Sequence, residues 1–145
     1  MKRLFILLAL LTSSLFTFAQ TNRNKVNLSD KELVNFLWGF AQAHPDGFTI
    51  GIDTFDQPRE GIVVSYAATQ NSFDKKSLPA VIKHAREHEG FVGGWYNPEN
   101  KKYYFDSNRI FPEDSLAAAV KFARENGQHT VYICSKDINV KSNYD

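Results

Sequence analysis

The most apolar block of the chain stands near its beginning. The run Leu4–Leu11 is uninterrupted, it follows Lys2 and Arg3, and the small residues Thr17 and Ala19 come after a less apolar stretch. This order is typical of a cleavable secretory signal peptide. The alternative is a membrane anchor, but the apolar run is shorter than the about 20 residues that a span requires. We therefore predict cleavage after Ala19, an exported protein that is periplasmic or extracellular, and no stable membrane anchor after cleavage.

Three later segments carry apolar residues at every third or fourth position, which predicts amphipathic helices. Ser29 and Glu32 form the sequence pattern of a capping box at the start of the first helix, and the polar residues 20–28 before it are expected to be a flexible leader. Leu37, Ile82 and Val120 lie on the three apolar stripes and should be buried. The expected starts and stops, in chain order, are Ser29 and His44, Ser77 and Gly90, and Pro112 and Gly127.

Five short runs between and after these helices are rich in β-branched and aromatic residues and are expected to be strands. The first two should pair antiparallel with each other, and the next two should form a hairpin across the turn at 97–100. The order α-ββ-α-ββ-α-β predicts one α+β domain over residues 29–140, with an antiparallel or mixed sheet that carries its helices on one face. The polar end of the chain, including the tail at 141–145, is expected to fray. The predicted strands are 48–52, 62–66, 91–96, 102–106 and 130–134.

Composition narrows the class of protein further. Cleavage after Ala19 removes Lys2 and Arg3 from the 17 cations, so 15 cations face 16 acids and the formal charge changes from +1 to −1. A nearly neutral surface exerts no general attraction on nucleic acid, and we predict no nucleic-acid partner. The single cysteine, Cys134, excludes an intramolecular disulfide.

Four motifs of the chain are similar to segments of a known domain. They are Gly47–Ile50 after a helix, Val92–Tyr96, the return strand Lys102–Asp106, and the helix end Ala123–Gln128 before the last strand. Together they resemble a small uncharacterised domain that occurs inside bacteriophage virion-associated proteins and other large multi-domain phage proteins. That domain has no established activity, so the resemblance implies a module that works beside others and identifies no catalytic residue.

The second hairpin is the first candidate for a binding surface. Alternation along its strands would place Trp95, Tyr103 and Phe105 on one or the other face and Tyr96, Tyr104 and Asp106 elsewhere. Aromatic rings with polar ends bind partners well, although ordinary core packing would account for the same residues. Adjacent glycines in a strand indicate a bulge or a close approach to the backbone; alternatively, they let the first helix cross the sheet at short range. The candidate residues are Gly93, Gly94, Trp95, Tyr96, Tyr103, Tyr104 and Asp106.

Histidine, cysteine and aspartate residues offer weaker candidates. His84 and His88 share a helix face, but the segment is not His-Glu-x-x-His and shows no third ligand, so we predict a solvated face and no metal. Cys134 in the last strand is expected to be a small buried hydrophobic residue. Asp53 and Asp56 are expected to be turn residues before they are an acid/base pair.

Three classes of function remain open. We favour an exported module that binds another protein. The second class is a small secreted hydrolase built on Gln70, Asn71 and Asp106 with a histidine, although no Gly-x-Ser-x-Gly surrounds Ser72. A cleft holding a carboxyl group or a histidine with a strongly shifted pKa would favour this enzyme, whereas a flat aromatic face would favour the module. The third class, an exported immunity-type inhibitor, differs from the module only in its partner. No cofactor is expected, and no catalytic residue can be named.

Overall fold

The computed structural model describes residues 27–142, which form three α-helices and one seven-stranded antiparallel sheet. The single α+β domain and its three helices are as predicted, whereas only five of the seven strands were expected. The predicted signal peptide at 1–19 and most of the predicted leader lie outside the described residues. The helices are α1 (Asp30–Ala43), α2 (Asp74–Arg86) and α3 (Leu116–Glu125). The strands are β1 (Phe48–Gly51), β2 (Ile62–Ser65), β3 (Ser72–Phe73), β4 (Phe91–Asn97), β5 (Lys102–Phe111), β6 (Thr130–Ile133) and β7 (Ile138–Lys141).

The helix starts follow the local sequence only in part. The capping box of α1 is present, with Glu32 N donating to Ser29 Oγ and Ser29 N donating to Glu32 Oε2 at 2.9 Å. Helix α2 begins before the predicted cap, because the Asp74 side chain accepts from Tyr103 N at 3.1 Å and fixes the helix start beside β5. The Ser77 hydroxyl then donates to Asp74 O inside the first turn. A 3₁₀ turn, Glu113–Ser115, separates Pro112 from α3.

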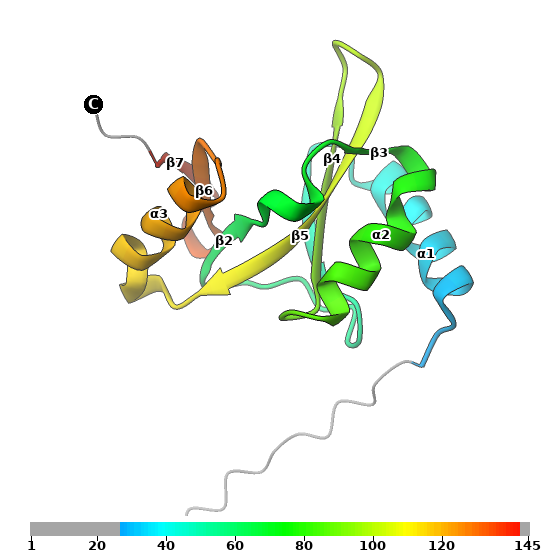
Figure 1. Ribbon diagram of the computed structural model, residues 1–145, viewed down its shortest axis with the longest axis horizontal. Helices are drawn as coiled ribbons and strands as arrows, with labels where there is room; N and C mark the ends of the chain where they lie inside the picture. Colours follow the sequence, from blue (N-terminus) through cyan, green and yellow to red (C-terminus); the bar gives the residue numbers. More distant parts are fainter. Residues whose placement is uncertain (1–26, 143–145) are drawn as a thin grey trace, which may run out of the picture.

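The predicted pairing of the first two strands is wrong. The sheet order is β1-β4-β5-β2-β6-β7, with β3 beside β5, so the β4–β5 hairpin lies between β1 and β2 (Figure 1). Strand β5 reaches Phe111 rather than Asp106, and this extra length gives β2 its partner, with Ile62 opposite Phe111. The prediction failed because it relied on the usual pairing of consecutive strands.

The end of the chain is more ordered than its composition suggests. Strand β7, which was expected to belong to a frayed tail, pairs along β6 from Thr130–Lys141 to Ile133–Ile138. Ser142 is fully buried, and its hydroxyl donates to Gln128 O at 2.5 Å. These contacts satisfy the edge of β6, which polar composition alone could not predict.

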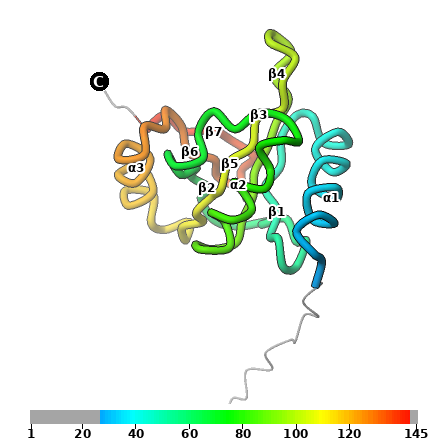
Figure 2. Tube along the Cα trace, turned by 45° about the vertical axis from the view of Figure 1, so that its right-hand side comes forward, coloured from blue at the N-terminus to red at the C-terminus, as the bar shows by residue number. Residues whose placement is uncertain are grey.

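All three helices pack on one face of the sheet, which we call the helix face. Directly paired residues of antiparallel strands share a face, so Phe105 and Phe111 of β5 lie on the same side as Ile62 and Val64 of β2. Phe105 belongs to a buried cluster with α1 and α2, whereas the other three residues belong to a second cluster with α3. Figure 2 shows α1 and α3 at opposite ends of the domain with α2 between them.

Leu37, Ile82 and Val120 are buried on their helices, at 0%, 2% and 7% exposure, which confirms the predicted phase of each stripe. Within residues 27–142, no helix combines the length and the apolar character that a membrane span needs.

Candidate functional site

The face of the sheet opposite the helices, which we call the open face, is hollowed into a groove of about 790 Å³. Strands on both sides of β5 contribute to it: β1 and β4 on one side, and β2 and β6 on the other. Its polar floor is formed by Asp106 and Asn108 of β5, Ser65 of β2 and Thr49 of β1. The topology therefore brings together side chains that lie as far apart in the sequence as residues 49 and 108.

The floor is organised by hydrogen bonds around Asn108, which is 3% exposed. The Ser65 hydroxyl lies 3.0 Å from Asn108 Oδ1, and Asn108 Nδ2 donates to Thr49 Oγ1 at 3.4 Å. The same hydroxyl also hydrogen-bonds the Asp106 carboxyl. A hydroxyl has a single proton to donate, so Ser65 can serve only one of these two acceptors at a time.

Asp106 is a partly buried acid on the open face. Burial raises the pKa of its carboxyl to about 6, and the Ser65 hydrogen bond opposes that shift. Among the described residues that line the groove there is no lysine, arginine or histidine, whereas Asp46 and Asp137 add two further acids. The charge of Asp106 is therefore not balanced by a neighbouring cation of the groove.

The two adjacent glycines of β4 make room for neighbouring side chains of the same domain. The β4–β5 pairing runs without interruption through Gly93 and Gly94, so there is no bulge. A Cβ at position 93 would clash with the Asn108 side chain, and one at 94 would lie 2.8 Å from the Phe105 ring. The glycines thus serve close packing, Gly93 under the groove floor and Gly94 in the core, and not the crossing of α1.

Trp95 is the exposed aromatic residue of the hairpin. It pairs with Tyr104, and the two rings stack with centroids 4.9 Å apart. Because partners share a face, Trp95 lies with Tyr104 and Asp106 on the open face, and its grouping with Tyr103 and Phe105 is not realised. At 42% exposure Trp95 stands at the margin of the groove.

The other two hairpin tyrosines lie on the helix face. Tyr96 and Tyr103 are paired and half-buried, and their ring centroids are 4.9 Å apart. Trp38 of α1 packs edge-on against Tyr103 at 5.1 Å. Tyr103 therefore joins the hairpin to α1, and neither tyrosine lines the groove.

Gln70 and Asn71 do not line the groove that contains Asp106. Gln70 Nε2 donates to Asn126 O at 3.3 Å, which joins the loop to the end of α3. Asn71 has a φ of 59°, the left-handed conformation of a turn residue. The constellation of Gln70, Asn71, Asp106 and a histidine is not assembled.

His84 of α2 and His88, in the turn just after α2, belong to an aromatic cluster on the helix face. Their rings stack at 3.9 Å, and Tyr66 lies against both of them. Burial, with the neighbouring His88 as a second cause, lowers the pKa of His84. The Tyr66 hydroxyl donates to Glu89 at 2.8 Å, and Glu89 lies 3.4 Å from Arg109. Over residues 27–142, no three His, Cys, Asp or Glu side chains are grouped so that they could hold a metal ion.

The remaining candidates are Cys134, Asp53 and Asp56, and their positions indicate structural roles. Burial raises the pKa of the half-buried Cys134 thiol, which keeps it protonated and poorly nucleophilic at neutral pH. Asp53 and Asp56 lie in the turn after β1, where Gly51 N donates to Asp56 O at 2.9 Å.

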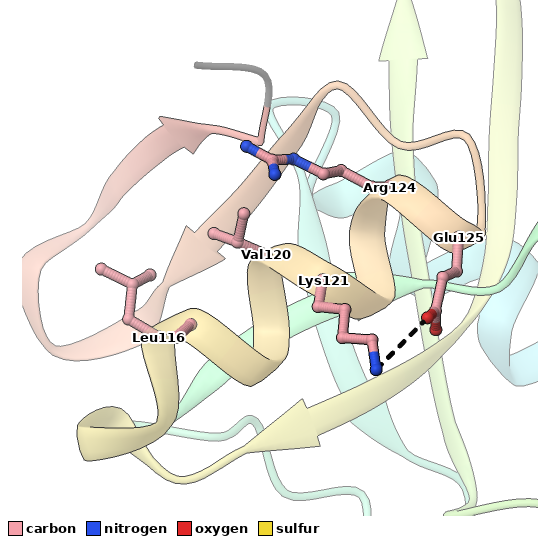
Figure 3. A pocket seen from close by; sticks show the side chains of 6 residues that line it. Leu116, Val120, Lys121, Arg124 and Glu125 are labelled. Carbon is pink, nitrogen blue, oxygen red and sulfur yellow. Dashed lines mark ion pairs between the residues drawn. The ribbon is translucent and has the colours of Figure 1, made fainter.

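A second hollow, of about 630 Å³, lies along α3. Its side chains all come from this one helix, and Figure 3 shows Lys121 and Glu125 joined across its edge by an ion pair of 3.8 Å. Leu116 and Val120 also belong to the α3 core cluster. The hollow is an apolar shelf along one helix.

The groove residues that sequence reasoning missed include Ser65, Asn108 and Tyr132. Ser65 ends a run of β-branched residues, and Asn108 continues the alternation that contains Tyr104 and Asp106. Reading β5 to its full length would have placed Asn108 beside Asp106 on one face. The approach of Ser65 depends on the pairing of β2 with β5, which the local pattern does not contain.

Comparisons of this chain with models of protein families, with curated proteins and with solved structures found no match. The resemblance to a phage domain stays a prediction.

Proposed function

We propose that this chain is an exported binding module that recognises another protein through the open face of its sheet. The observation that carries this proposal is the position of Trp95, an exposed indole at the margin of a polar groove on the one sheet face that no helix covers. Tryptophan dominates many protein interfaces, because it buries a large area and orders few side-chain torsions.

Charge supports a protein partner over a nucleic acid. The groove contains Asp46, Asp106 and Asp137, and the described residues that line it include no cation. A phosphate backbone requires lysine and arginine contacts and would be repelled here. A protein surface can instead offer hydrogen-bond donors and cations to this floor.

Replacing Trp95 with alanine tests the proposal. The chain from Gln20 is used to capture partners from the envelope and medium of the producing cell, and the affinity of each captured protein is then measured. We expect Trp95→Ala to weaken binding more than tenfold, with little change in melting temperature because the ring is 42% exposed.

The matched control is Ile138→Ala, which removes the other large exposed hydrophobic side chain of the described residues. Ile138 pairs with Ile133, a core residue of the helix face, so its loss should leave binding unchanged. Equal effects of the two variants, or full binding by Trp95→Ala, would refute the proposed surface.

A second function, a small enzyme, is favoured by one observation. A carboxyl group with a pKa of about 6 in a groove, as at Asp106, can act as a general acid or base near neutral pH. Acid–base catalysis also needs a second catalytic group, and the other titratable side chains of the groove are poorly suited to that role. Tyr132 donates to Asp137 at 2.8 Å and has its pKa raised to about 12, and the pKa of Cys134 is also raised. For this reason the binding module is preferred.

The two functions are separated by the fate of the captured partner. A binding module leaves the mass of the partner unchanged after prolonged incubation. A mass change that is produced by the unaltered chain and lost in Asp106→Asn would establish the enzyme instead.

A further inference from the structure

The floor of the groove has more capacity to accept hydrogen bonds than its own residues can satisfy. An ionised carboxylate offers about four acceptor positions. Near Asp106, Ser65 supplies one proton that it shares with Asn108 Oδ1, while Asn108 Nδ2 is turned toward Thr49. The carboxylate therefore lies in the groove with acceptor positions that a ligand can occupy.

The surroundings of the groove select a positively charged donor. The other titratable residues that line it are Asp46 before β1, Tyr132 of β6, Cys134 just after β6, and Asp137 before β7. None of these side chains can carry a positive charge, and a concave surface of one sign concentrates its field. An anion would be repelled, and a neutral polyol would leave the charge of Asp106 unbalanced.

Trp95 adds an apolar wall at a suitable distance. It lies two residues along β4 from Gly93, which pairs with Asp106, so the backbone of Trp95 is offset by about 7 Å along the strand from that of Asp106. One side of the indole stacks on Tyr104, and the exposed part borders the groove. An aliphatic stem can lie along such a ring while its charged end reaches the floor.

Resting on the proposed function, we infer that the groove takes a lysine or arginine side chain of the protein partner, with its cation on Asp106 and its stem against Trp95. Lysine would bring three donors to the carboxylate, and arginine would bring a planar fork.

The probe is a library of N-acetylated hexapeptide amides with a central lysine or arginine, compared with the same library carrying acetyl-lysine and with a panel of neutral oligosaccharides. We expect the chain from Gln20 to retain lysine or arginine peptides at least tenfold better than acetyl-lysine peptides. Asp106→Asn should abolish that preference, and lowering the pH from 7.5 to 5 should weaken binding about tenfold as the carboxyl takes up its proton.

Glu125→Gln is the control, because it removes one negative charge from exposed α3 on the helix face and should leave the preference intact. Three results would overturn the inference: no preference for the cation, an equal loss in Glu125→Gln, or selective binding of oligosaccharides. If a captured protein binds in a Trp95-dependent manner but Asp106→Asn binds it undiminished, the proposed function stands and this inference fails. Misfolding of Asp106→Asn could also abolish the preference, so its fold is checked separately. Its circular dichroism spectrum should match that of the unaltered chain.

Discussion

At the scale of single residues, the open face holds a charge where folding alone would favour a neutral group. Partial burial of Asp106 disfavours the carboxylate, and the hydrogen bond from Ser65 does not offset this cost. An isolated domain has no use for such a residue, whereas a ligand that brings a cation recovers the lost energy. Under the proposed function, the cation of a bound partner would offset this cost.

Asp106→Asn should accordingly stabilise the protein above pH 6. The folded carboxyl has a pKa of about 6 against an ordinary value of 3.8, so between these values the folded state binds more protons than the unfolded state. Stability then falls as the pH rises through this window, and the full cost, about 1–3 kcal/mol, is present at pH 8. Urea unfolding should show this gain for the variant at pH 8 and almost none at pH 3.5. A variant that is less stable than the unaltered chain at pH 8 would contradict the proposed burial of charge.

At the scale of elements, the β4–β5 hairpin determines the arrangement of the sheet. It separates β1 from β2, and its long strand β5 joins the two core clusters. The glycines of β4 allow this packing, since Gly94 lies under the rings of Phe105 and Phe48. Side-chain volume at one backbone position thus controls how closely two strands and the core can fit.

Gly94→Ala should destabilise the domain by about 1–3 kcal/mol, because its Cβ would stand 2.8 Å from the Phe105 ring and 2.9 Å from the Phe48 ring, both buried. The comparison is Gly39→Ala in α1, where nothing lies within 4 Å of the new Cβ. That change should stabilise by about 0.5–1 kcal/mol through helix propensity and lower entropy of the unfolded chain. Thermal and urea unfolding would measure both variants, and opposite signs are expected. A Gly94→Ala protein as stable as the unaltered chain would show that the rings can move aside.

At the scale of the whole molecule, the two faces of the sheet differ, as the proposed role of an exported binding module requires. The helices cover one face, and the other face carries the groove and the exposed indole. The exported state itself is a proposal that follows from the signal-like pattern at the start of the sequence. An extracytoplasmic setting would also leave the groove open to changes of pH near the pKa of Asp106.

Export predicts a defined mature protein. The form found outside the cytoplasm of the native host should begin at Gln20, because Thr17 and Ala19 provide the small side chains that signal peptidase reads. Intact-mass analysis and N-terminal sequencing of that form measure this directly. Retention of Lys2 and Arg3 in the exported protein would exclude cleavage at this site.

The sequence by itself determined the elements whose signals are local. The capping box at Ser29, the stripes through Leu37, Ile82 and Val120, and the β4–β5 hairpin depend on residues a few positions apart, so periodicity predicted them. It also singled out Trp95 and Asp106 as candidates. It missed β7 because a polar strand at the end of a chain has no local pattern that distinguishes it from a tail.

Only the tertiary structure decided which strands are neighbours and therefore which side chains meet. The groove requires that β5 pair with β2 on one side and β4 on the other, so that Ser65, Asp106 and Asn108 share a face with Trp95. It also decided that Gln70 and the histidines lie elsewhere. Strand pairing is set by packing between distant segments, and the burial that shifts the pKa of Asp106 exists only after that packing is complete.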